Sequence, residues 1–195
     1  MVVRPCPTRS QSRSGLGALL CLTVLVALSA CGEKSQNNAS AASCNQSCQD
    51  NATGAATIGL LSFAYNQNLA GKAVGKQDLT ANCPLGGTAH ITGTNGYDSS
   101  TGIITMDLAF DLAACVAADS GYTLSFDGVV NQSGTLEQQG QISVAYSGSA
   151  FSFNGTVQGE AVSGSDCDLA LQEMRDSNDT NYRVNGLLCG RAVSY

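Results

Sequence analysis

Cysteine is the residue type through which this sequence has the most chemistry available. The 195-residue chain contains nine cysteines, two of which form the motif Cys44-x-x-x-Cys48. This spacing is neither the C-x-x-C of a thioredoxin-like redox site nor that of a zinc ribbon, and no histidine lies nearby to complete a ligand set. We therefore predict a structural disulfide here, although a four-residue separation on a helix approaches the geometric limit.

Acid and base chemistry has few candidates. The single histidine, His90, lies in the alternating run Thr88, His90, Thr92, which predicts a solvated strand residue. Asp107 and Asp111 would share the polar face of one strand with Asp127 on the next. Such carboxylates could act as a pair in glycan hydrolysis, but a solvated polar face has the same pattern and is much commoner.

Motifs of the common enzyme classes are missing from the sequence. It has no G-x-S-x-G, H-E-x-x-H or Walker motif, and no G-x-G-x-x-G that opens a helix. Residues 176–181 resemble the start of a calcium loop, but Asn181 stands where an EF-hand needs glycine and Leu187 where it needs glutamate. We predict a hairpin tip there, and no catalytic residue, metal or cofactor for the chain.

The first thirty residues have the features of an export signal. Arginines precede an uncharged apolar run from Leu16 to Ala30, which is shorter than the ~20 residues of a membrane-crossing helix. The run ends in Leu28-Ser29-Ala30-Cys31, which resembles the lipobox of bacterial lipoproteins. The resemblance implies that a diacylglycerol is attached to Cys31 and that the chain is cut before it. The alternative is an ordinary or uncleaved signal with no lipid on Cys31.

The resemblance also implies a location. Gly32 is not the aspartate that is linked to inner-membrane retention in lipoproteins, so the outer membrane is the expected address. Residues 31–42 are rich in Ser, Asn, Gln and Ala, which predicts a flexible tether. Beyond residue 30 the chain has six Lys and Arg against fifteen Asp and Glu, a formal charge of −9. Nucleic acid is therefore not an expected partner.

The elements that must position these residues are mostly strands. In Ile103 to Leu112 the even positions are apolar and the odd ones largely polar, which predicts a half-buried strand. The same period of two recurs in residues 122–126, 142–146 and 151–157. We predict a mainly β domain over residues 83–195, an antiparallel meander of about seven curved strands forming a half-barrel or an open sheet. Its expected turns are Asn95-Gly96, Gln132-Ser133-Gly134, Ser147-Gly148-Ser149 and Ser177-Asn178-Asp179.

The meander predicts how six cysteines pair once Cys31 is assigned to lipid and two others leave with the signal. Hairpin strands place residues equidistant from the tip opposite each other. Cys83 and Cys115 are both sixteen residues from Ser99, and Cys167 and Cys189 are equidistant from the last predicted tip. We predict that these two pairs form disulfides at the open ends of the first and last hairpins, in a compartment that preserves them.

The segment before the strands, residues 43–82, is expected to contain a helix that packs on the sheet. Ile58, Leu61, Tyr65 and Leu69 follow one another at steps of three and four within Ala55 to Val74. Leu61, Phe63 and Tyr65 also alternate, so a strand remains an alternative. A helix in the concavity of the sheet would fill its core, whereas a displaced helix would leave a groove.

Glycines within the strands predict strong curvature. Gly93, Gly128, Gly155 and Gly186 occupy similar strand settings. A glycine inside a strand often marks a bulge, a bend or the close approach of another backbone. A row of them is therefore typical of a bent sheet.

These observations leave three functional hypotheses. The first is a non-enzymatic envelope lipoprotein, held in the membrane through Cys31, that binds or supports an unknown envelope protein. The second is a carrier in which a half-barrel holds an apolar or lipid ligand, with residues 55–74 as lid or plug. The third is a carboxylate-dependent glycan hydrolase.

Overall fold

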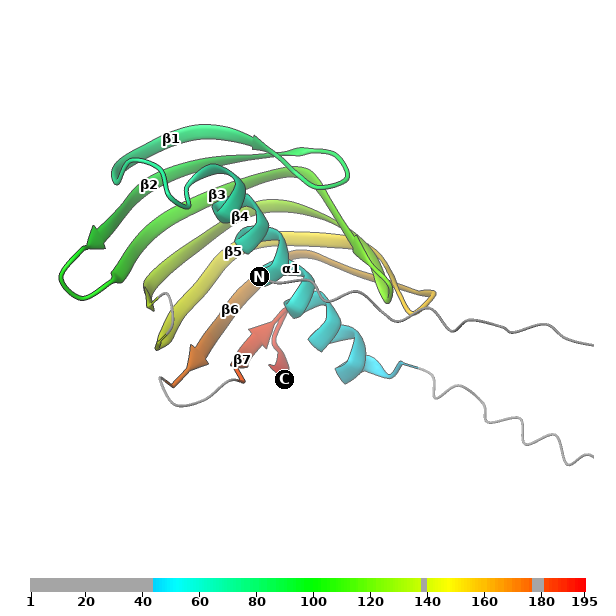
Figure 1. The fold of residues 1–195 in the computed structure, drawn as a ribbon. Coiled ribbons are helices and arrows are strands. Elements are labelled where there is room, and N and C mark those ends of the chain that lie inside the picture. The colour runs from blue at the N-terminus through cyan, green and yellow to red at the C-terminus, as the bar shows by residue number, and fades with distance from the viewer. Residues whose placement is uncertain (1–43, 138–139, 177–180) are drawn as a thin grey trace, which may run out of the picture. The chain divides into compact units, whose positions relative to one another are not determined.

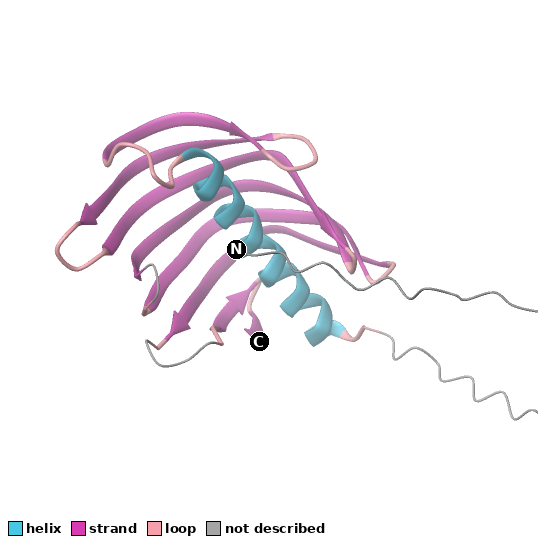
Figure 2. Ribbon diagram, in the orientation of Figure 1, coloured by secondary structure: helices cyan, strands magenta, loops and turns pink. Residues whose placement is uncertain are grey.

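The computed structural model describes residues 44–137, 140–176 and 181–195. Within these ranges the chain forms one helix and eight strands, whose arrangement Figures 1 and 2 show. Their bounds are α1 Gln46–Asn68, β1 Gly75–Asn82, β2 Thr88–Asp98, β3 Ile103–Asp119, β4 Tyr122–Glu137, β5 Ile142–Val157, β6 Glu160–Arg175, β7 Arg183–Leu188 and β8 Arg191–Ser194.

All eight described strands belong to one open antiparallel sheet. Each strand pairs with its neighbours in the sequence, so β1 and β8 are the two edges. Strong curvature of the sheet is visible in Figure 1, where α1 runs diagonally across its concave side. The predicted fold, an antiparallel meander of curved strands with one N-terminal helix packed on it, is confirmed.

The core lies between α1 and the concave face. On β3 the side chains of Met106, Leu108, Phe110 and Leu112 are buried, while the residues between them are exposed or half-buried. The predicted alternation of this strand is therefore correct. Leu61 of α1 is fully buried against the same face, and its removal from water contributes to holding the helix there.

Bulges and glycines bend the sheet. The pairing register shifts after Leu112 in β3 and after Asp127 in β4, and each shift bends its strand. Gly186 has φ +151°, and a Cβ at this position would meet the carbonyl oxygen of Ala170 on the neighbouring strand. This close approach of two backbones is one of the roles predicted for the strand glycines.

Helix α1 begins earlier than predicted and ends earlier. The Asn45 side chain accepts a hydrogen bond from Cys48 N at 2.9 Å, which caps the N-terminus. At the other end Leu69 N and Ala70 N both donate to Tyr65 O, and Gly71 follows with φ +72°. The predicted range of 55–74 was wrong because it rested on apolar spacing and gave no weight to the N-cap residue Asn45.

Three of the predicted turns lie inside strands. Asn95-Gly96 belongs to β2, Gln132-Ser133-Gly134 to β4 and Ser147-Gly148-Ser149 to β5. They were wrong because polar, glycine-containing stretches bend these long strands without ending them. The fourth, Ser177-Asn178-Asp179, lies outside the described residues. Strand β1 was not expected, since its sequence is mostly polar.

Candidate functional site

The Cys83–Cys115 disulfide is confirmed, with a Cα separation of 5.4 Å. Its predicted place at the open end of the β2–β3 hairpin also holds, because it lies just beyond the pair Thr88 and Ala113, although the predicted centre is slightly displaced. Asp98 faces Ile103, so the β2–β3 hairpin is not centred on Ser99. Cys83 follows β1 in a turn that folds onto β3, where Val116 N donates to Gly86 O at 2.9 Å.

The Cys167–Cys189 disulfide is also confirmed, with a Cα separation of 4.7 Å. It joins Cys167 of β6 to the residue that directly follows β7, and Cys189 N donates to Asp168 O at 2.9 Å. The pair lies at the open end of the β6–β7 hairpin as predicted, although this hairpin is not the last one because β8 follows it. A third disulfide links Cys44 to Cys48 across the first turn of α1, with a Cα separation of 5.3 Å.

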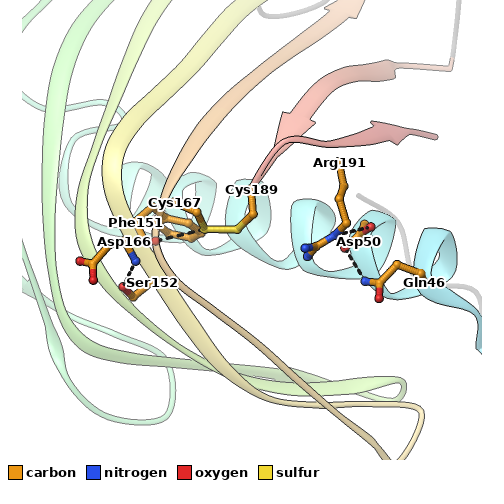
Figure 3. The surroundings of a disulfide bond; sticks show 8 residues. All are labelled: Gln46, Asp50, Phe151, Ser152, Asp166, Cys167, Cys189 and Arg191. Atoms are coloured by element: carbon orange, nitrogen blue, oxygen red, sulfur yellow. Dashed lines mark hydrogen bonds and ion pairs between the residues drawn. A yellow bond between two sulfur atoms is a disulfide. The ribbon is translucent and has the colours of Figure 1, made fainter.

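The N-terminal end of α1 is attached to β8 by polar contacts, shown in Figure 3 for the charged pair. Arg191 Nε lies 2.9 and 3.0 Å from the two carboxylate oxygens of Asp50, whose side chain is 5% exposed. Gln46 Nε2 donates to the same carboxylate at 3.0 Å. These contacts satisfy the buried negative charge of Asp50. Asp50 and Arg191 lie near opposite ends of the described chain, so the ion pair joins those two ends.

Asn51 covers the free edge of β8. Its Nδ2 donates to Ser194 O and its Oδ1 accepts from Ser194 N, both at 2.9 Å. The Ser194 backbone groups point away from β7, because the flanking residue Tyr195 is the one that bonds to Val184. The Asn51 amide thus takes the place of a further strand at this edge.

The residues considered as candidates for acid and base chemistry are exposed. His90 Nε2 lies 2.9 Å from Asp78 Oδ1 across β1 and β2, and its side chain is 48% exposed. Asp107 and Asp111 are exposed on β3. Asp127 Oδ1 accepts from Ala114 N at 2.8 Å, which holds the backbone at the β3 bulge. Its contact is structural.

Two predicted sites lie wholly or partly outside the described residues. Cys31 is one of them, and residues 177–180 of the proposed hairpin tip are the other. Asp176, which directly precedes residues 177–180, is described. Its Oδ2 lies 3.3 Å from Arg183 Nη2 in an exposed ion pair.

Two hollows flank the C-terminal half of α1 on the concave face, and Tyr65 lines both. The first, which we call the Asn95 recess, has a volume of about 340 Å³ and includes Leu69, Asn95 and Ile104 among its walls. The second, which we call the Gln132 recess, has a volume of about 200 Å³. Its walls are Ser62, Tyr65 and Asn66 of α1 and Met106, Gln132, Leu136, Ile142, Val144, Tyr146 and Glu173 of the sheet.

The polar groups of the two recesses differ in how well they are satisfied. Asn95 is 7% exposed, and its Oδ1 accepts from Gln77 Nε2 at 2.8 Å. Gln132 is 4% exposed, but its Oε1 accepts no hydrogen bond from any described group. A buried acceptor without a donor is rare in folded proteins. The Gln132 recess is therefore the candidate binding site.

Tyr146 supplies the fixed polar partner in this recess. Its hydroxyl donates to Glu173 Oε2 at 2.7 Å, and the side chain is almost fully buried. Burial, and then the nearby Glu173 carboxylate, hold the pKa of the Tyr146 phenol well above its usual value, while a hydrogen bond from Gln132 partly opposes this. The phenol therefore stays protonated and keeps donating to Glu173 throughout the physiological pH range.

The sequence interpretation missed Gln132 because it assigned the residue to a turn. A usable signal was present, since Val130 and Gln132 continue the period of two on the inward face of β4. A glutamine on that face is a polar residue at a core position. Such residues mark either a satisfied network or a binding site.

Within the described ranges, no group of three or more His, Cys, Asp or Glu side chains is placed to hold a metal ion. The helix in the same part of the chain is not long and apolar enough to cross a membrane. Comparison with known proteins finds no family model, no curated protein and no solved structure that matches this chain.

Proposed function

We propose that this protein is an exported lipoprotein of the cell envelope, held in the outer membrane through Cys31, and that its folded part is a non-enzymatic binding module. One observation carries the proposal. The three disulfides use every cysteine of the described chain, so Cys31 has none of them as a partner. Its place after Leu28-Ser29-Ala30 is then explained by lipid attachment.

The disulfides also support export. Disulfides persist in oxidising compartments and are rare in the cytosol. Two of them close long loops, with sequence separations of 32 and 22 residues, so they constrain the unfolded chain strongly. A fold that depends on such links matches a protein that works outside the cytoplasm.

A carrier of a small apolar ligand is the second candidate, and the two recesses favour it. Helix α1 occupies the middle of the concave face, so a ligand would lie beside the helix rather than in an open half-barrel. Both recesses are close to or below the lower end of the ~300–1,000 Å³ range of small-molecule pockets. They suit a ligand smaller than a complete membrane lipid.

Substitution of Cys31 tests the anchor. In cells fed radiolabelled palmitate, Cys31→Ser should abolish labelling and release the protein from the membrane fraction. The matched control is Cys21→Ser, which makes the same change inside the signal and should leave labelling intact. Continued labelling of Cys31→Ser would overturn the proposal, because another residue would then carry the lipid.

A further inference from the structure

We propose that β1 is a dimerisation edge, at which this strand pairs antiparallel with β1 of a second copy of the chain. The two eight-stranded sheets would then join into one continuous sheet. The inference goes beyond the binding-module function proposed above, and it depends neither on the lipid anchor nor on the recesses.

The two edges of the sheet are covered to different extents. At β8, which has four residues, Asn51 bonds to the outward backbone groups of Ser194. Strand β1, at the other edge in Figure 1, has eight residues in unbroken register with β2 and contains no proline. Such a strand is a template for another strand. In the described part of the chain β1 is the one uncovered edge, so assembly through it closes at two copies.

The direction of the β1 backbone groups follows from the pairing with β2. Cys83 N donates to Gly87 O at 3.1 Å, and this pair continues the register that joins Ala81 to Ala89. Bonded and non-bonded pairs alternate in an antiparallel ladder, so the odd-numbered residues of β1 bond to β2. The even-numbered residues point their N–H and C=O groups outward, and no described backbone group outside the sheet bonds to them. They are Lys76, Asp78, Thr80 and Asn82.

Symmetric pairing is favoured in the register with its twofold axis at Leu79. Lys76 then lies opposite Asn82 of the second copy, and Asp78 lies opposite Thr80, so every outward backbone group of both strands finds a partner. An axis at Asp78 would place two carboxylates directly opposite each other, which is unfavourable. Leu79 is half-buried on the concave side, and the axis at Leu79 covers it with its own counterpart.

The apolar residues that flank β1 favour a second copy over an unrelated strand. Val74, directly before the strand, is 55% exposed, and Leu85, in the turn after it, is 62% exposed. Antiparallel pairing brings the start of one β1 to the end of the other, so each Val74 approaches Leu85 of the second copy. Both flanks then remove from water an apolar surface that the single chain exposes.

The number of copies per complex is the first measurement. It is obtained by sedimentation equilibrium of the full chain in a detergent that matches the density of the solvent. We expect a monomer–dimer equilibrium without larger species. Hydrogen exchange followed by mass spectrometry is the second measurement. The backbone amides of residues 76–82 should exchange more slowly as the protein concentration rises, because the outward N–H groups become bonded.

Thr80→Pro tests the edge itself. The substitution removes an outward N–H and places a ring where the second strand would lie, so the variant should be a monomer. Proline is tolerated at such an edge position because the lost N–H makes no bond to β2. Near-ultraviolet circular dichroism reports whether the variant is folded.

A charge exchange tests the register. Asn82→Lys places a lysine opposite Lys76 of the second copy at two symmetric positions, so the dissociation constant of the dimer should rise about fivefold. Adding Lys76→Asp to the same chain restores opposite charges and should recover the affinity. Asn154→Lys is the matched control, since it makes the same charge change at an exposed position inside the sheet and should leave the affinity unchanged.

Three results would overturn the inference. One is a monomer at all accessible concentrations; if its residue 76–82 amides were nevertheless protected, another segment of the chain would cover the edge. Another is an undiminished dimer in folded Thr80→Pro. The third is a failure of Lys76→Asp to recover the affinity lost in Asn82→Lys, which would mean that the copies meet in a different register or at a different surface.

Discussion

The two ends of α1 meet the same sheet in opposite ways. At the N-terminal end Asp50 is bound by Arg191 and Gln46, and Asn51 pairs with both backbone groups of Ser194. At the C-terminal end the helix lies between two recesses, and Gln132 opposite it has an acceptor without a donor. The buried polar groups at the N-terminal end are thus satisfied, whereas one buried acceptor near the C-terminal end has no donor among the described residues.

The difference separates stability from binding. Satisfied buried polar groups hold two elements in one arrangement, whereas an unsatisfied group costs free energy that only a ligand or water recovers. Helix α1 is therefore fixed where it meets β8. Its other end can keep an imperfectly filled interface without losing its place on the sheet.

Substitution of Arg191 should weaken the attachment of the N-terminal end of α1 to β8. Arg191→Leu leaves the buried Asp50 carboxylate with the hydrogen bond from Gln46 but without its ion pair, so the free energy of unfolding should fall by about 2 kcal/mol. The half-exposed position of Arg191 keeps the loss below that of a fully buried pair. Urea unfolding followed by circular dichroism measures the change.

Arg191→Lys is the control for this prediction. It keeps the positive charge but has a different donor geometry, so it should lose less stability than Arg191→Leu. Equal stability of Arg191→Leu and the natural protein would show that the ion pair does not fix the helix.

Alkaline pH should lower the free energy of unfolding through Tyr146, which lies in the Gln132 recess beside the C-terminal half of α1. The Tyr146 phenol has a raised pKa in the folded protein, whereas in the unfolded chain it releases its proton near pH ~10. Its contribution is fully present below pH ~10 and is lost as the pH rises towards the folded pKa. The loss is about 1.4 kcal/mol per pH unit from this group. Unfolding free energies between pH 9 and about 11.5 measure this slope.

Two variants identify the origin of the slope. Tyr146→Phe should reduce it, since no phenol remains to titrate at this position. Glu173→Gln should keep most of it, because burial is the larger cause of the raised pKa and the Glu173 charge the smaller one. An unchanged slope in Tyr146→Phe would assign the alkaline loss to other groups.

Much of the fold could be predicted because its causes are local. The alternation from Met106 to Leu112 places one face of β3 in the core, and the strand glycines indicate curvature. The start of α1 was predicted too late because the prediction followed apolar residues only. The helix begins after its cap Asn45, and Thr53 and Thr57 in its first half are polar yet buried. Their hydroxyls donate to carbonyls within the helix, a solution that apolar spacing does not reveal.

The site was harder to predict because its causes are not local. Asp50 is buried through an arginine 141 residues away, which no pattern around Asp50 indicates. Gln132 was assigned to a turn because Gln-Ser-Gly is a turn-like composition, and only the register of β4 with its neighbours shows that it faces inward. The two long-range disulfides could be predicted because the cysteines of each pair are equidistant from an expected hairpin tip, and sequence spacing shows this directly.

Substitution of Gln132 has the smallest expected effect, and its sign is the opposite of that for Arg191. Gln132→Leu removes a buried acceptor that has no donor and replaces it with an apolar side chain beside Met106 and Val144. The substitution also removes the contact of Gln132 with Tyr146, so the free energy of unfolding should rise by less than about 1 kcal/mol, measured by urea unfolding without added ligand. Gln172→Leu, at an exposed position, should stay within about 0.5 kcal/mol. A clear loss of stability in Gln132→Leu would show that Gln132 is satisfied in the folded protein, and the two ends of α1 would then not differ in this respect.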